Sequence, residues 1–350
     1  MTIRNSPVRG EGVFASDLLK IGLMFVLAIS AIVMSLFIGR YSISLTQFWH
    51  LLAAKLLGLS SNLPENVEMV FFRVRLPRVI VAFLAGSGLA VAGASYQGVF
   101  RNPMVSPDIL GATAGAGLGA ALALLFSFSS LGVQIASFVM GIIAVSITYL
   151  ICLRVGKRGN VILTLVLAGM VVSALFQAGI SLIKFTADPY TKLPEITFWL
   201  MGSLASVKAG DIAKLGIPLA CACLPLFLLR WQVNLLAFSD EEASAMGVNT
   251  KRIRFLVIVC STLITSGVVS IGGIIGWVGL VMPHLTRMIV GPDYKVLMPA
   301  SILLGGTYLL LVDDLARSMT AMEIPLGILT AVIGAPFFIY LLCGGRSGWL

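Results

Sequence analysis

Long apolar runs recur through the whole 350-residue sequence, and they constrain its fold more than any other feature. The first run, 21-IGLMFVLAISAIVMSLFI-38, contains no charged side chain. A helix needs about 20 mainly apolar residues to cross a bilayer, whereas a membrane β-barrel shows short segments of alternating hydropathy. Hydrophobic residues make up 58% of the chain, too many for a water-soluble domain to bury. The sequence therefore predicts an all-α, polytopic membrane protein.

About ten such runs follow one another, and each predicts a membrane span. They lie at residues 21–38, 79–99, 109–128, 133–153, 161–183, 212–229, 255–271, 274–290, 296–312 and 325–343. The first run is longer than the apolar core of a signal peptide, which is about 7–15 residues, and it lacks a small-residue cleavage site. We therefore expect it to be retained as the first span.

The balance of charge orients these spans. The chain has 24 Lys and Arg against 15 Asp and Glu, and its basic residues flank the apolar runs, which favours membrane orientation over nucleic-acid binding. The basic N-terminus predicts a cytoplasmic start, and ten spans return the C-terminus to the cytoplasm. This arrangement puts Arg73, Arg75 and Arg78 at the outer end of the second span. Because cytoplasmic loops normally collect the basic residues, these arginines call for a specific role.

The sequence contains no motif that would power transport. There is no GxxxxGK[ST] phosphate-binding loop and no Cys/His cluster that would hold a metal. Gradient-driven carriers usually place ionisable residues in mid-membrane, and the interiors of the first eight predicted spans contain almost none. The pattern favours a separate ATPase partner. A gradient-driven carrier and a non-transporting membrane scaffold remain alternatives.

The hydrophilic segment between the sixth and seventh spans predicts a short helix. In 239-SDEEASAMGV-248, Ser239 or Asp240 can cap the first turn, acids follow in that turn, and Gly247 can end the helix. The segment lies on the predicted cytoplasmic side. A rigid helix there would suit a groove in a partner, and an ordinary solvated loop is the alternative.

Several stretches resemble the permease subunits of the FecCD family, the type II ABC importers of metal chelates. They occur in family order over about residues 70–345: 75-RLPR-78, 92-AGASYQGVFRNPMVSPDILGATAGAG-117, 199-WLMGS-203, 235-LLAFSDEEASAMGV-248, 272-GGIIGWVGLVMPHLTR-287, 291-GPDYKVLMPAS-301, 313-DDLAR-317 and 323-EIPLGILTAVIGAPFFIYLL-342. The resemblance implies the type II importer permease fold. Residues 1–20 would be a cytoplasmic segment, 21–345 a single transmembrane permease domain with a coupling loop at about 230–254, and 346–350 a cytoplasmic tail.

The resemblance also implies partners and a location. A homodimer in the bacterial inner membrane would bind two ATP-binding cassette subunits on its cytoplasmic face and a periplasmic binding protein outside. The chain itself would be no enzyme and would hold no cofactor or metal, because ATP and Mg belong to the ATPase. An iron chelate, either a siderophore or haem, is the expected substrate. Cobalamin and molybdate- or tungstate-type oxyanions are the alternatives.

Three sets of residues take roles by resemblance. Those expected to dock the binding protein are Arg75, Arg78 and Arg317. Those expected to contact the ATPase are Asp240, Glu241, Ala243, Ala245, Met246 and Gly247. Those expected to form a cytoplasmic gate or line the pathway are Asn102, Pro103, Met104, Ile162, Leu163 and Thr164. For the arginines, snorkelling at the membrane rim or pairing with Asp313 or Asp314 is the alternative.

Overall fold

Helices are the only regular secondary structure in the described part of the chain. A computed structural model describes residues 11–39, 41, 43–57, 64–155 and 161–343. The longer helices are α1 (Glu11–Phe37), α4 (Leu76–Phe100), α6 (Ser130–Val155), α7 (Val161–Thr186), α9 (Ala209–Leu228), α12 (Thr250–Gly272), α14 (Tyr294–Ser318) and α15 (Leu326–Cys343). The shorter ones are α2 (Leu45–Leu57), α3 (Glu65–Met69), α5 (Ala112–Leu125), α8 (Lys192–Leu200), α10 (Arg230–Leu235), α11 (Asp240–Ala245) and α13 (Val278–Val290). A π-helix, η1 (Val70–Arg75), joins α3 to α4, and a 3-10 turn, η2 (Pro107–Leu110), precedes α5.

The helices match the predicted number of spans. Within the described residues, seven helical segments are long and apolar enough to cross a membrane, and three shorter apolar helices accompany them at 112–125, 278–290 and 326–340. The prediction of an all-α fold with about ten spans is confirmed. Of the predicted cytoplasmic segments, 1–10 and 346–350 lie outside the described residues, while residues 11–20 belong to α1, which begins before the predicted first span.

The predicted second span is longer than its apolar pattern. Instead of starting near residue 79, one continuous helical segment runs from Glu65 to Phe100 through α3, η1 and α4. The π-helical turn lies directly before Pro77, which has no N–H and whose ring would clash with the carbonyl of Arg73 in a regular α-helix. The wider turn accommodates the proline without ending the helix.

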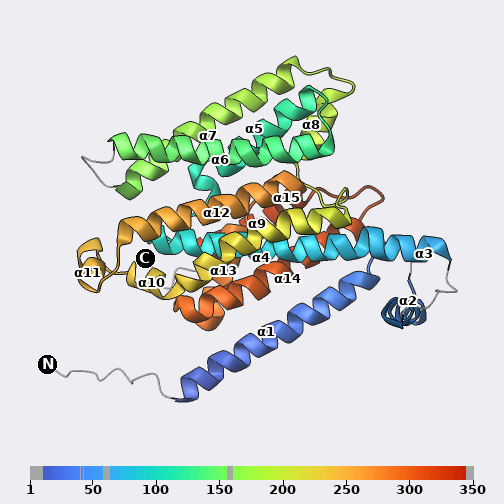
Figure 1. Cartoon of the computed structure of the whole chain (residues 1–350), viewed down its shortest axis with the longest axis horizontal. Coiled ribbons are helices and arrows are strands. Elements are labelled where there is room, and N and C mark those ends of the chain that lie inside the picture. The colour runs from blue at the N-terminus through green and yellow to red at the C-terminus, as the bar shows by residue number, and fades with distance from the viewer. Residues whose placement is uncertain (1–10, 40, 42, 58–63, 156–160, 344–350) are drawn as a thin grey trace.

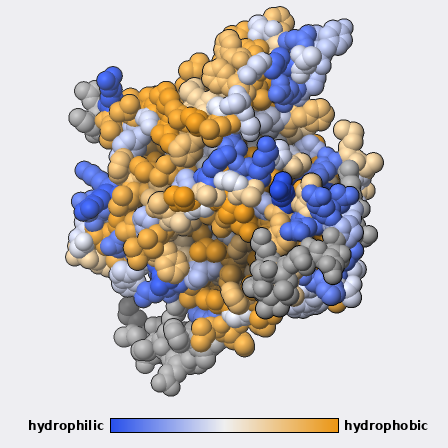
Figure 2. Space-filling model, turned by 45° about the vertical axis from the view of Figure 1, so that its right-hand side comes forward, coloured by the Kyte–Doolittle hydropathy of each residue, from blue (hydrophilic) through white to orange (hydrophobic). Residues whose placement is uncertain are grey.

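Helix α4 forms the centre of the bundle. It is buried along most of its length and packs against α9, α12, α13 and α14, while α1 covers α14 and α4 on the opposite side from α5, α6 and α7 (Figure 1). Helices α2, α3 and α8 lie at one end of the bundle and α10 and α11 at the other. We call the first the outer end and the second the inner end. Apolar side chains cover much of the face shown in Figure 2, as expected of a surface in contact with lipid or another membrane subunit.

Two glycines on α4 permit the closest helix contacts. A Cβ atom on Gly86 would lie 2.2 Å from the carbonyl oxygen of Gly305 in α14, and one on Gly93 would lie 1.8 Å from that of Gly279 in α13. Packing rather than water exclusion holds helices together in lipid, so small residues at these crossings set the distance between backbones. The tight core therefore depends on the absence of side chains at these positions.

We expect Gly93→Ala to lower the free energy of unfolding by about 1–3 kcal/mol, because the new methyl group forces α4 away from α13. Thermal unfolding in detergent checks this. Gly216→Ala in α9 is the matched control, since its new Cβ would meet no atom closer than 3.9 Å. Alanine also favours a helix over glycine by up to about 1 kcal/mol, so the control keeps or raises its melting temperature. Equal melting temperatures for the two variants would contradict the packing argument.

Candidate functional site

The arginines at the outer end are buried inside the chain. Arg75, Arg78 and Arg317 expose between 4% and 6% of their surface, although the sequence places all three at the rim of the bundle. Arg73, one turn before Arg78 on the same helical segment, is exposed. Burying a charge in a membrane protein is costly unless a partner neutralises it, so each buried arginine needs a partner nearby.

Arg78 links α4 to α14 and to the segment before α15. Its Nε and Nη2 donate to the Asp313 carboxylate at 2.8–3.1 Å, and its Nη1 and Nη2 donate to Glu323 at 2.9 Å. The Asp313 side chain is fully buried, whereas that of Glu323 is 30% exposed. The planar guanidinium thus holds two carboxylates in bidentate, charge-assisted contacts. The ion pair between Arg78 and Asp313, which the sequence analysis gave as an alternative, is therefore present in the structure.

Arg317 and Arg75 bind the end of α1. Arg317 Nη2 donates to the Ser35 carbonyl at 2.7 Å and contacts Asp314, while Ser35 Oγ donates to Asp314 at 2.6 Å. Arg75 Nη1 donates to the carbonyls of Leu36 at 2.8 Å and Phe37 at 3.2 Å, and its Nη2 donates to that of Tyr41. The last carbonyls of a helix lack intrahelical partners, so these bonds cap α1.

These residues form one group, which we call the outer charge cluster: Ser35, Arg75, Arg78, Asp313, Asp314, Arg317 and Glu323. It contains three arginines and three carboxylates, so its formal charges balance. In this structure its members stabilise the chain by joining α1, α4, α14 and the segment before α15. The proposed contact with a binding protein has to be compatible with these internal bonds.

At the inner end, α11 is a short capped helix. The Ser239 N–H donates to Glu242 at 2.9 Å, and the Glu242 N–H donates to Ser239 Oγ at 3.1 Å, which makes a capping box. These bonds hold the pKa of Glu242 below its usual value, so the capping contact is lost as the pH falls through that lowered pKa. Gly247 has φ +83° and ends the helix, as the sequence predicts.

The residues predicted to contact the ATPase divide between two sides of α11. Glu241, Ala245 and Met246 are exposed, whereas Ala243 is fully buried beneath the helix. Asp240 turns toward the bundle, where its carboxylate lies 2.6 Å from Arg101 Nη2 and 3.3 Å from Arg254 Nη2. The exposed side chains are those available to a partner, while Ala243 and Asp240 anchor the helix.

The predicted gate residues lie in two segments toward the inner end. Asn102 and Met104 are exposed just after α4, where Asn102 Oδ1 accepts a bond from the Met104 N–H at 2.8 Å. Ile162, Leu163 and Thr164 begin α7, with Leu163 exposed. The chain after the first segment continues into η2, which packs against α7. Their role as a gate stays a prediction.

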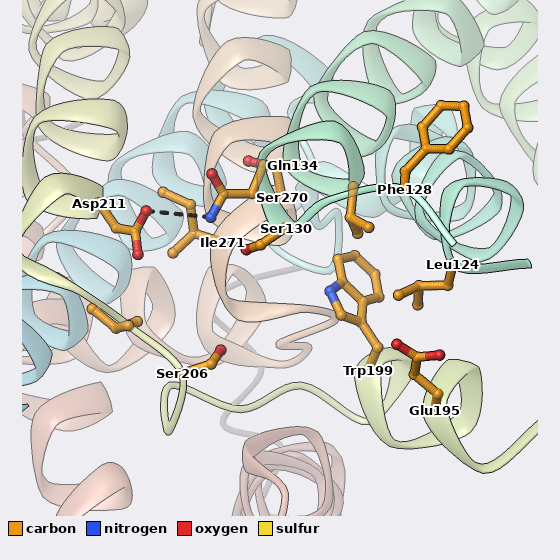
Figure 3. Close-up of a pocket in the computed structure, with 12 residues that line it drawn as sticks. Leu124, Phe128, Ser130, Gln134, Glu195, Trp199, Ser206, Asp211, Ser270 and Ile271 are labelled. Carbon is orange, nitrogen blue, oxygen red and sulfur yellow. Dashed lines mark hydrogen bonds between the residues drawn. The ribbon is translucent and has the colours of Figure 1, made fainter. Parts of the chain in front are cut away.

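The outer end also contains a pocket that the sequence did not indicate (Figure 3). It has a volume of about 220 Å³ and lies among the ends of α5, α6, α8, α9 and α12. Asp211 accepts bonds from Gln134 Nε2 at 3.3 Å and Lys214 Nζ at 2.8 Å on one side, and Trp199 and Glu195 from α8 lie across from it. Ligand pockets usually measure about 300–1,000 Å³, so this one is too small for a metal chelate.

We expect Arg78→Met to lower the free energy of unfolding by about 3–5 kcal/mol, because it removes the hydrogen-bonded partner of buried Asp313 and leaves only Arg317 Nε, at 3.9 Å. Arg73→Met removes the same charge from the exposed side of the same helical segment and serves as the control. The measurement is thermal unfolding in detergent. If both variants unfold at the wild-type temperature, the outer charge cluster does not stabilise the fold.

Known proteins resemble this chain along nearly its whole length. The model of the FecCD transport family matches residues 26–344. The molybdate import system permease protein MolB of Haemophilus influenzae is 42% identical over 327 residues, which cover 93% of this chain and 96% of that protein. The Fe(3+)-citrate import system permease protein YfmE of Bacillus subtilis is 37% identical over 334 residues, or 93% of this chain and 95% of that protein.

A solved structure agrees with these relatives. It is described as an inward-facing conformation of a metal-chelate type ABC transporter, and it is 39% identical to this chain, with a TM-score of 0.83 over 93% of this chain and 99% of that one. The family match covers far more than half of the sequence, and the helical bundle has the fold of such a permease. The chain therefore belongs to the FecCD transport family, as a multi-pass ABC importer permease of the bacterial inner membrane.

Proposed function

We propose that the chain is the membrane subunit of an importer whose substrate arrives on a periplasmic binding protein and whose energy comes from a separate ATPase. The observation that carries this proposal is α11, a capped helix with exposed Glu241, Ala245 and Met246 at the inner end of a permease of this family. A rigid helix that projects from the bundle suits a groove in a partner. ATP and Mg bind to that partner, and this chain catalyses no covalent step.

We also propose that two copies of the chain enclose the pathway. The outer pocket of about 220 Å³ is too small for the substrate. Helix α7 carries exposed apolar side chains along its length, among them Leu167, Met170 and Leu175, and α15 carries Val332 and Ile339. Such faces suit either lipid or a second membrane subunit. A pathway between two copies would be lined by such faces.

An iron chelate, either a siderophore or haem, is the substrate class that we propose. The relative named for Fe(3+)-citrate and the metal-chelate transporter support it. A molybdate-type oxyanion is the second candidate, because the relative named for molybdate is 42% identical over nearly the whole chain. The ligand that copurifies with the cognate binding protein distinguishes the two classes.

A gradient-driven carrier is less compatible with the described structure. Such a carrier needs an ionisable group that can gain or lose an ion within the membrane. Asp313 and Asp314 lie near the outer end of α14 and are bound by Arg78 and Arg317. Their carboxylates stabilise the helix packing and are not open to a pathway in this conformation.

In proteoliposomes, we expect uptake to require the ATPase subunit, the binding protein and ATP. Met246→Asp puts a charge and a shorter side chain on the exposed side of α11, so it should release the ATPase on copurification and abolish uptake. Ala205→Asp, at an exposed position in the outer loop, is the control and should retain both. Uptake by this chain without an ATPase would refute the proposed function, and a Met246→Asp complex that still copurifies and transports would refute the role of α11.

We further propose that the outer charge cluster helps to dock the binding protein. Asp313 and Glu323 occupy the donors of Arg78, so a carboxylate from outside can reach this guanidinium only by replacing Glu323, the more exposed partner. Arg75 and Arg317 lie beside it in the same cluster, where Arg317 is paired with Asp314 and Arg75 is bonded to carbonyl oxygens at the end of α1. Exposed Arg73 contributes to long-range attraction, which salt screens.

Glu323→Gln should therefore strengthen docking several-fold, because the neutral amide competes less well for Arg78 than a carboxylate does. Binding of the purified binding protein to the detergent-solubilised complex measures the change. Glu65→Gln removes the same charge from an exposed position at the outer end and controls for the general field. Equal affinities for the two variants would exclude Arg78 from the docking contact.

A further inference from the structure

The segment that carries α11 is bonded to two helices that are distant in sequence. Through the backbone it continues only into α9 and α12, on either side of residues 229–249. Side-chain hydrogen bonds, however, also join it to the inner end of α4 and to the inner end of α14. These two attachments are formed by Arg101 and Asn234.

Arg101 attaches the end of α4 to both sides of the turn before α11. Its Nε donates to the Leu236 carbonyl at 2.6 Å, just after α10, and its Nη2 donates to Asp240 at 2.6 Å, in the first turn of α11. The residue has φ 50°, the left-handed conformation that ends α4. The Arg101 and Asp240 side chains are 33% and 49% exposed, and exposed ion pairs contribute little to stability. The geometry of the contact therefore matters more than its contribution to folding.

Asn234 attaches α10 to the start of α14. Its Nδ2 donates to Asp293 at 2.7 Å, and its Oδ1 accepts a bond from the Tyr294 N–H at 2.8 Å. Both functional ends of the amide are used, so the contact fixes position as well as distance. The neighbouring surface is close-packed, since a Cβ on Gly98 of α4 would meet Val233 at 2.6 Å and Tyr294 at 2.8 Å.

The two attached helices pack against each other and reach the outer charge cluster. α4 and α14 are in backbone contact at Gly86 and Gly305, and near their outer ends Arg78 bonds to Asp313. The helix pair is thus bonded to α10 and α11 at the inner end and joined by a buried ion pair at the outer end. Close-packed helices transmit displacement because their interiors have low compressibility.

We propose that Arg101 and Asn234 are positioning residues that couple α11 to the α4–α14 pair, so that movement of α11 against the ATPase reaches the outer face. This inference rests on the proposed function, because it takes α11 as the ATPase contact and the outer end as the binding-protein face. It assigns a role to two residues that hold α10 and α11 against α4 and α14. Without the Arg101 bonds, α11 keeps its ion pair with Arg254 of α12 but loses its ion pair with the end of α4.

The test uses the complete complex with its ATPase and binding protein in proteoliposomes. Arg101→Gln removes both bonds of the guanidinium, and we expect a complex that still assembles and hydrolyses ATP in the absence of binding protein. Transport per ATP hydrolysed, and the stimulation of hydrolysis by the binding protein, should each fall by about fivefold or more, within the usual range of coupling between two sites. Asn234→Ala should reduce the same two ratios.

Two further variants test whether a lower ratio comes from lost coupling of α11 to α4 or only from a lost positive charge. Arg101→Lys keeps the charge but lacks the planar fork whose Nε and Nη2 reach Leu236 and Asp240 separately, so its ratios should fall between those of the wild type and Arg101→Gln. Arg252→Gln removes one exposed positive charge near α11 and should behave as the wild type does. This graded order distinguishes positioning from general electrostatics.

The outcomes are distinct. Wild-type ratios in Arg101→Gln overturn the inference, as does loss of the ATPase on purification, since Arg101 would then only hold α11 in place. Equal losses in Arg101→Gln and Arg252→Gln overturn it as well, because charge alone would explain them. A wild-type complex that shows no ATP-dependent uptake refutes the proposed function itself, and the inference falls with it.

Discussion

The pairing of Arg78 with Asp313 is the contact that orders the outer end of this permease. A guanidinium within the helix bundle cannot rely on water, so it needs carboxylates in fixed positions. Asp313 meets this need from α14, and Glu323 meets it from the segment before α15. Once α4 and α14 are joined in this way, Arg75 and Arg317 lie where they can hold the last turn of α1. This ion pair thus helps to determine how α1, α4, α14 and the segment before α15 pack at the outer end.

At the inner end, the position of α11 depends on contacts with other helices. A short helix in a loop has too few internal hydrogen bonds to hold a fixed position by itself. The capping box of Ser239 and Glu242 forms α11, whereas Arg101, Arg254 and Asn234 determine where it lies. Local sequence therefore makes the helix, and distant side chains orient it. A partner that moves α11 also moves the groups bonded to it.

The sequence predicts the helices better than the contacts between them. Apolar runs and caps depend on neighbouring residues, which is why the ten spans and the helix after Ser239 could be inferred. The burial of Arg78 could be given only as an alternative, pairing with Asp313 or Asp314, because its partners Asp313 and Glu323 are 235 and 245 residues away in the chain. The contact of Arg101 with Asp240 was missed for the same reason, because the two residues are 139 positions apart. The extension of α4 outward to Glu65 was also missed, because the charged stretch before Pro77 has the composition of a membrane rim.

The buried arginines also change the meaning of the family motif that contains them. An arginine at a membrane rim would be expected to contact a soluble partner directly. Here Arg78 instead holds helices together inside the bundle. The two roles are compatible only if the outer contact is an exchange of carboxylates. Asp313 is fully buried and holds Arg78 in place, whereas Glu323 is partly exposed and lies on a short connection between two helices. An exchange at Glu323 leaves the buried Arg78–Asp313 pair intact and removes only the bond between Arg78 and the segment before α15. Such a docking contact could alter the position of α15 without leaving an unpaired charge inside the bundle.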